Sequence, residues 1–97
     1  MLKITHDSPA ADILRVNLYG LFTAEYVPEV EKLLARNKNA RRLAVDLTNV
    51  IFVDRAAMEF LRAALSRKIR LENLPSWINR WIQQEARKGV SFLRVQR

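Results

Sequence analysis

The sequence lacks cysteine altogether, and it contains only two glycines and three prolines among its 97 residues. Without cysteine, disulfides, iron–sulfur clusters and thiolate zinc sites are excluded. The small share of glycine and proline, alongside 49% hydrophobic residues, is typical of a packed globule and not of a disordered tail. We therefore expect residues 1–97 to form one domain that folds without covalent cross-links.

The patterns that mark membrane segments and enzyme active sites are also missing. No run of about 18 uncharged apolar residues occurs, and residues 1–7 contain no long apolar stretch, so neither a membrane span nor a secretion signal is expected. His6 is the sole histidine, Asp46 has no second metal-ligating residue at suitable spacing, and there is no nucleophile–base pair or glycine-rich phosphate loop. We expect a cytoplasmic protein that is not an enzyme and has no metal and no cofactor.

Positive charge is in excess, because 17 lysines and arginines against 10 aspartates and glutamates give a net charge of +7. This charge would attract an acidic protein, an anionic membrane surface or a nucleic acid. One alternative function is therefore a small basic nucleic-acid-binding domain in which an exposed tryptophan stacks on bases. Interspersed glutamates argue instead for an ordinary solvated surface. The basic residues form two local groups, Arg36, Lys38, Arg41 and Arg42 in the first and Arg67, Lys68 and Arg70 in the second.

Several runs rich in β-branched and other apolar residues predict strands. A turn is expected over residues 8–12, and Gly20 is expected to end the second strand. A further apolar run, 50–53, follows a turn expected near Asn49. The other predicted strands are 2–5, 13–19, 43–47, 69–71 and 90–95.

Three segments carry apolar residues three and four positions apart, which predicts amphipathic helices over 24–36, 56–68 and 75–89. Thr23 is the predicted N-cap of the first helix, although Pro28 moves its regular part to near Val27. Asp54 is the predicted N-cap of the second helix. The third opens with Pro75 and ends at Gly89. Alternating strands and helices predict an α/β domain with a mixed, mostly parallel β-sheet and helical crossovers.

Three segments resemble the STAS domain family, which includes bacterial anti-sigma-factor antagonists and regulatory domains of transporters. Residues 14–20, Leu-Arg-Val-Asn-Leu-Tyr-Gly, look like the family's second strand and its glycine. Residues 44–54, Ala-Val-Asp-Leu-Thr-Asn-Val-Ile-Phe-Val-Asp, are similar to its strand-and-loop signature. Residues 69–75, Ile-Arg-Leu-Glu-Asn-Leu-Pro, look like a later strand that leads into a helix opened by proline. The resemblance spans about residues 13–93 and implies a single STAS-like domain.

The resemblance also implies a non-catalytic protein-interaction module. Antagonists of this family are switched by an anti-sigma kinase, which phosphorylates a hydroxyl in an Asp-Ser-Ser-Gly type motif. The matching residues here are Asp54-Arg55-Ala56-Ala57, and Ala56 at the phosphoacceptor position has no hydroxyl. This degenerate motif implies that the usual phosphorylation does not occur. The implied partner is a protein: an anti-sigma factor, its kinase, or a transporter subunit.

A partner-binding surface is expected where the Gly20 turn and the 53–56 turn meet at the carboxyl ends of parallel strands. Leu21 and Phe22 replace an acidic pair that is frequent in the family, and both are expected to lie outside the central core. Arg55 is expected to be unpaired, and Asp54 to act as a helix cap, a partner contact or both. A face bearing Trp77 and Trp81 is the alternative interface. The expected partner-binding residues are Leu21, Phe22, Asp54, Arg55, Ala56 and Met58.

Overall fold

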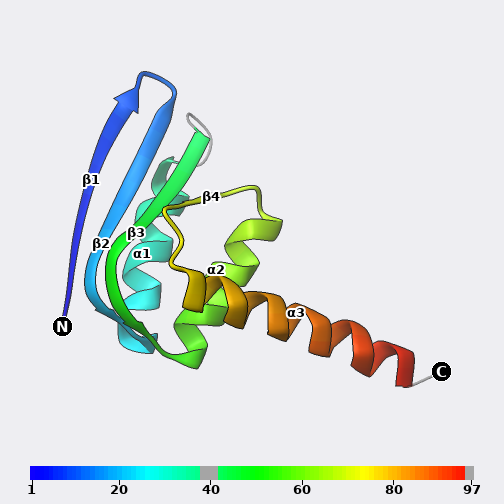
Figure 1. Cartoon of the computed structure of the whole chain (residues 1–97). Coiled ribbons are helices and arrows are strands. Elements are labelled where there is room, and N and C mark those ends of the chain that lie inside the picture. The colour runs from blue at the N-terminus through cyan, green and yellow to red at the C-terminus, as the bar shows by residue number, and fades with distance from the viewer. Residues whose placement is uncertain (38–41, 96–97) are drawn as a thin grey trace.

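Four strands form one mixed sheet in the spatial order β1-β2-β3-β4 (Figure 1). The computed structural model describes residues 1–37 and 42–95. β1 (Leu2–Ala10) runs antiparallel to β2 (Ile13–Phe22), whereas β3 (Arg42–Val53) and β4 (Arg70–Glu72) run parallel to β2. The mixed, mostly parallel sheet predicted from the sequence is therefore confirmed.

Helices connect the parallel strands, so the predicted crossovers are also confirmed. A short 3-10 helix, η1 (Ala24–Tyr26), leads into α1 (Val27–Asn37), which returns the chain to β3. The regular helix begins at Val27, as Pro28 predicted, but the Thr23 side chain makes no capping hydrogen bond. α2 (Arg55–Ser66) connects β3 to β4, and α3 (Ser76–Val95) extends away from the sheet (Figure 1).

The core lies between one face of the sheet and the helices. In β2, Leu14, Val16 and Leu18 are buried because alternate residues of a strand point to the same face. α2 supplies residues at helical spacing to the other side of this core. Its buried residues are Ala57, Met58, Phe60, Leu61 and Ala64.

The first hairpin is longer than predicted. β1 continues past Thr5 to Ala10, so its turn is confined to Ala11 and Asp12. Gly20 does not end β2, which continues to Phe22. The prediction was wrong because a glycine weakens a strand only locally, while β2 still pairs with β1 at Gly20 and with β3 as far as Phe22.

Gly20 has a structural role in this hairpin. Its φ of +108° lies in a region that residues with side chains rarely adopt, and a Cβ at this position would lie 2.7 Å from the carbonyl oxygen of Met1. The same carbonyl oxygen accepts a hydrogen bond from the Leu21 amide at 3.1 Å. Glycine is therefore required both by backbone conformation and by the approach of β1.

Replacing Gly20 with alanine is expected to lower the free energy of unfolding by about 1–2 kcal/mol, because φ is strained and β1 is pushed away. Urea denaturation measures this change. Amide hydrogen exchange should show faster exchange at Leu21 in the Gly20→Ala variant. Unchanged stability together with unchanged exchange would contradict the role assigned to this glycine.

β3 is one continuous strand of 12 residues, so the turn predicted near Asn49 is wrong. Two register shifts against β2 take the place of that turn, one between Asn17 and Tyr19 and one between Gly20 and Leu21. Each shift accommodates an extra residue of β3 as a β-bulge, which changes the direction of side chains without breaking the strand.

The end of the chain also differs from the prediction. α3 runs through Gly89 to Val95, where the sequence predicted a helix stop and a strand over 90–95. One glycine inside a helix costs only about 1 kcal/mol and does not oblige the helix to end. A strand also needs a neighbour to pair with, and β4, the edge strand that precedes this segment in the chain, has three residues.

No helix within residues 1–37 and 42–95 covers the opposite face of the sheet, and polar side chains cross it from strand to strand. Arg15 binds Asp7 through two hydrogen bonds, of 2.8 and 3.2 Å. Asp46 accepts hydrogen bonds from the amide and the hydroxyl of Thr48 and from the side chain of Asn73.

The hydrogen bonds from Arg15 and Asn17 lower the pKa of Asp7. Partial burial of Asp46 opposes such a shift, but its hydrogen bonds outweigh the burial and lower its pKa as well.

These shifts predict how stability depends on pH. Because both carboxylates have a lower pKa in the folded state, they stabilise it above their ordinary pKa of 3.8, and this contribution is lost as the pH falls through the lowered values. The free energy of unfolding should therefore fall below about pH 4 in the wild type and fall less in Asp46→Asn. Urea denaturation at a series of pH values tests this, and parallel curves for the two proteins would contradict it.

Candidate partner-binding surface

The end of β2 and the turn between β3 and α2 lie together at the carboxyl ends of the parallel strands. Phe22 is paired with Val53 in the sheet, and the Asp54 amide donates a 3.2 Å hydrogen bond to the Phe22 carbonyl. The predicted meeting of these two segments is confirmed. The helix start is confirmed to within one residue, since α2 begins at Arg55.

The Asp54 carboxylate holds this end of the molecule together. One oxygen, Oδ1, accepts a 2.9 Å hydrogen bond from the Ala57 amide, which is the N-cap interaction predicted for α2. The other, Oδ2, accepts a 2.8 Å hydrogen bond from the Ala24 amide at the start of η1. Both acceptor oxygens thus serve the backbone, so the structure gives Asp54 a positioning role.

Four large side chains form an exposed apolar patch on the two strands that end here: Tyr19, Leu21, Ile51 and Phe52. Leu21 and Phe52 are direct neighbours in the sheet. Their exposed fractions are 37% and 48%, and Ile51 reaches 73%. Ile51 is the extra residue of the second bulge, which turns both Ile51 and Phe52 away from the core.

Of this patch, only Leu21 was predicted from the sequence to lie at the surface. A signal for the others was present, because residues 50–53 are four consecutive apolar residues in a strand. Since successive side chains of a strand point to opposite faces, such a run must place some of them on the outer face. Which ones face outward depends on the bulge, and periodicity does not reveal it.

Two of the residues expected at the partner-binding surface, Phe22 and Met58, are buried, so this part of the prediction was wrong. Phe22 has no exposed surface and packs edge-to-face against Phe60, with ring centroids 5.9 Å apart. Met58 is also completely buried, on the inner face of α2. The expectation that Phe22 lies outside the central core was wrong because β2 continues past Gly20 and keeps its inward alternation.

Arg55 and Ala56 are both exposed at the first turn of α2, but Arg55 is not unpaired as expected. Its guanidinium lies 3.0 Å from a carboxylate oxygen of Glu85 in α3 and 3.5 Å from one of Glu59. These carboxylates offset the unfavourable position of a cation at a helix N-terminus. Arg55 therefore connects α2 to α3, and its charge at the surface is partly neutralised.

The two tryptophans of α3 differ in their surroundings. Trp81 packs against the hydrophobic core, whereas Trp77 is 43% exposed. The buried stripe of this helix contains Ile78 and Ile82. Core packing therefore accounts for Trp81 and leaves Trp77 as a separate exposed aromatic group.

Comparison with known proteins gives structural matches alone. No family model matches the sequence, and neither does any curated protein. The structure is similar to that of the anti-sigma factor antagonist SpoIIAA in its unphosphorylated form, with a TM-score of 0.62 over 92% of this chain and 98% of that one, at 10% identity. The chain has a STAS-like fold. A STAS-domain anti-sigma-factor antagonist from Rhodobacter sphaeroides matches with a TM-score of 0.50 and 18% identity, over 72% of this chain and 84% of the other.

A third solved structure, described as Mglu, matches 73% of this chain with a TM-score of 0.57 and 17% identity. Only 19% of that chain is covered, so the fold occurs there as part of a larger protein. In the described part of the present chain, no helix is long and apolar enough to span a membrane. The same residues contain no group of three or more histidines and carboxylates arranged to hold a metal ion.

Proposed function

We propose that this chain is a non-catalytic regulatory module that binds another protein through the carboxyl end of its sheet. The observation that carries the proposal is the exposed apolar patch beside the start of α2. Large apolar side chains that are exposed together commonly mark protein-binding sites, and aromatic residues supply much of the binding energy there. The proposed surface consists of Tyr19, Leu21, Ile51, Phe52, Arg55 and Ala56.

The STAS-like fold supports the choice of partner. Two solved structures of this fold are described as anti-sigma-factor antagonists. The proposed partner is therefore an anti-sigma factor or its kinase, and a transporter subunit is the alternative. Asp54 contributes by positioning α2 and η1, while Phe22 and Met58 support the surface from the core.

We further propose that binding is not switched by phosphorylation at the start of α2. Arg55, Ala56 and Ala57 carry no hydroxyl group, so the first turn of the helix offers no phosphoacceptor. Ala56 is exposed at the position where the family has its acceptor. Regulation would then depend on the abundance or the state of the partner.

Binding to purified anti-sigma kinases tests the proposal, beginning with any that is encoded beside this gene. Phe52→Ser should weaken binding about tenfold, equivalent to about 1.4 kcal/mol, because it removes an exposed aromatic group of the patch. Calorimetry measures the affinity. After incubation with the kinase and ATP, mass spectrometry should find no phosphoryl group on residues 54–57.

Leu65→Ser is the matched control, because Leu65 is 45% exposed and lies at the other end of α2. It should leave the affinity within about twofold, since the side chain is far from the proposed surface. Circular dichroism checks that both variants fold. Equal affinity of Phe52→Ser and the wild type would contradict this surface, and failure of every anti-sigma kinase and anti-sigma factor to bind would contradict the proposed partner.

A further inference from the structure

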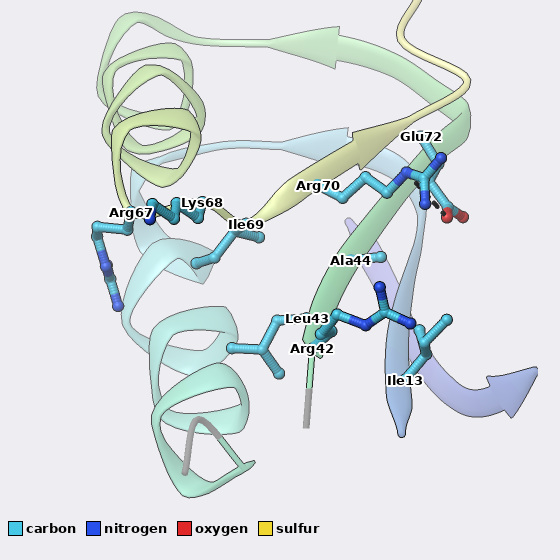
Figure 2. Close-up of a pocket in the computed structure, with 9 residues that line it drawn as sticks. All are labelled: Ile13, Arg42, Leu43, Ala44, Arg67, Lys68, Ile69, Arg70 and Glu72. Carbon is cyan, nitrogen blue, oxygen red and sulfur yellow. Dashed lines mark ion pairs between the residues drawn. The ribbon is translucent and has the colours of Figure 1, made fainter. Parts of the chain in front are cut away.

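The opposite end of the sheet contains a cavity of about 430 Å³. It lies at the amino ends of β3 and β4 and beside the last turn of α2 (Figure 2). This volume is within the range of about 300–1,000 Å³ that is typical of small-molecule sites. The cavity is separate from the proposed partner-binding surface, and the two share no residue.

The cavity combines an apolar wall with several cations. Ile13, Leu43 and Ile69 supply apolar surface. Arg42 comes from the start of β3, Arg70 from β4, and Arg67 and Lys68 from the turn between α2 and β4. In Figure 2, Leu43 and Ile69 lie in the middle of the cavity. Arg67 and Lys68 are on one side of them, and Arg42 and Arg70 are on the other. Glu72 is the one acidic residue that lines the cavity.

The cations keep much of their capacity to donate hydrogen bonds. The closest approach of Arg67 to Glu31 is 3.8 Å and that of Arg70 to Glu72 is 4.0 Å, both too long for hydrogen bonds. Within residues 1–37 and 42–95, Lys68 has no ion pair. Arg42 binds Asp12 through Nε and Nη2, which leaves its Nη1 group available. Surface ion pairs of this kind are worth at most about 1 kcal/mol, so an anion can compete with them.

Ordinary helix capping explains only part of this arrangement. Cations near the end of α2 interact favourably with the helix dipole, which accounts for Arg67 and Lys68. Arg42 and Arg70 belong to strands and gain nothing from that dipole.

We propose that this cavity binds a small organic phosphate, with its phosphoryl group held by Arg42 and Arg70 on one side and its apolar part against Leu43 and Ile69. Guanidinium groups bind phosphate oxygens in a bidentate manner. A small molecule fits better than a nucleic-acid strand because acidic residues flank the cavity, with Asp12 beside Arg42 and Glu31 beside Arg67. Of the first basic group in the sequence, Lys38 and Arg41 lie outside the described residues.

Titration of the ¹⁵N-labelled protein with 1-naphthyl phosphate tests this proposal by NMR. The probe should bind saturably and shift the amide signals of Leu43, Lys68, Ile69 and Arg70. Inorganic phosphate and 1-naphthol should each bind at least about tenfold more weakly, because phosphate lacks the apolar part and 1-naphthol lacks the phosphoryl group. The variant Arg70→Gln should weaken binding of the probe about tenfold.

Arg70 is exposed, so Arg70→Gln is expected to fold. Arg62→Gln is the matched control, since Arg62 is an exposed cation of α2 that does not line the cavity; its affinity should stay within about twofold of the wild type. Absence of saturable binding at millimolar probe would overturn the proposal, as would equal affinity for 1-naphthol or for inorganic phosphate. A single-stranded RNA oligonucleotide that binds more tightly than the probe, with shifts spread beyond the cavity, would overturn it in favour of nucleic-acid binding.

Discussion

Replacement of Phe22 by alanine is expected to lower the free energy of unfolding by about 3–5 kcal/mol. The side chain is completely buried between β2 and α2, and its removal leaves a cavity next to Phe60, whose ring lies 5.9 Å away in an edge-to-face arrangement. A domain of this size has a total stability of about 5–15 kcal/mol, so the variant should be unfolded in a measurable fraction of molecules. Urea denaturation followed by circular dichroism measures the loss.

Phe52→Ala is the matched control, because it removes the same ring from a position that is 48% exposed. It is expected to cost less than about 1 kcal/mol, since much of that ring is already in contact with water. A similar loss of stability in the two variants would contradict the assignment of Phe22 to the core and Phe52 to the surface. The pair also separates folding from binding, because only Phe52 belongs to the proposed surface.

Asp54→Ala is expected to destabilise the protein by about 2–3 kcal/mol, because two backbone amides lose a charged acceptor. The Ala57 amide loses the cap of α2, and the Ala24 amide loses the bond that connects η1 to it. Amide exchange at these two positions should accelerate together in the variant. Urea denaturation measures the change in stability.

Asp54→Asn provides an intermediate case, because its side chain retains one acceptor oxygen and replaces the other with a donor. It should therefore cost less than Asp54→Ala. Asp12→Ala, which removes an exposed partner of Arg42, should cost at most about 1 kcal/mol. If Asp54→Ala is no more destabilising than Asp12→Ala, the carboxylate does not hold η1 and α2 together as described.

Local patterns in the sequence were sufficient for several elements of the fold. The cap at Asp54 and the start of α1 at Val27 were predicted correctly, because each depends on a few adjacent residues and their own backbone preferences. The apolar residues of the run 13–19 likewise predicted a strand, which is part of β2. The order of strands and helices then predicted a mostly parallel sheet with helical crossovers.

Tertiary structure decided which side chains at the carboxyl ends of the strands are buried and which are exposed. Phe22 and Phe52 are the same residue type, and both lie near the end of a strand. Continued pairing of β2 past Gly20 directs Phe22 inward, whereas a bulge in β3 turns Phe52 outward. Neither feature is encoded in local periodicity, because a register shift depends on how two distant strands align.

Tertiary structure also decided the electrostatic contacts between segments that are far apart in the chain. Arg55 looked unpaired in the sequence, but α3 brings Glu85 to within 3.0 Å of it from 30 residues away. The two basic groups of the sequence also contribute to one cavity, since β3 and β4 are adjacent parallel strands whose amino ends meet beside the last turn of α2. The sequence by itself determined the type and order of the elements as far as the start of α3, apart from the division of β3 into two runs, because these depend on neighbouring residues. Tertiary structure decided which charges meet and which apolar groups remain exposed, because those depend on strand register and helix packing between segments far apart in the chain.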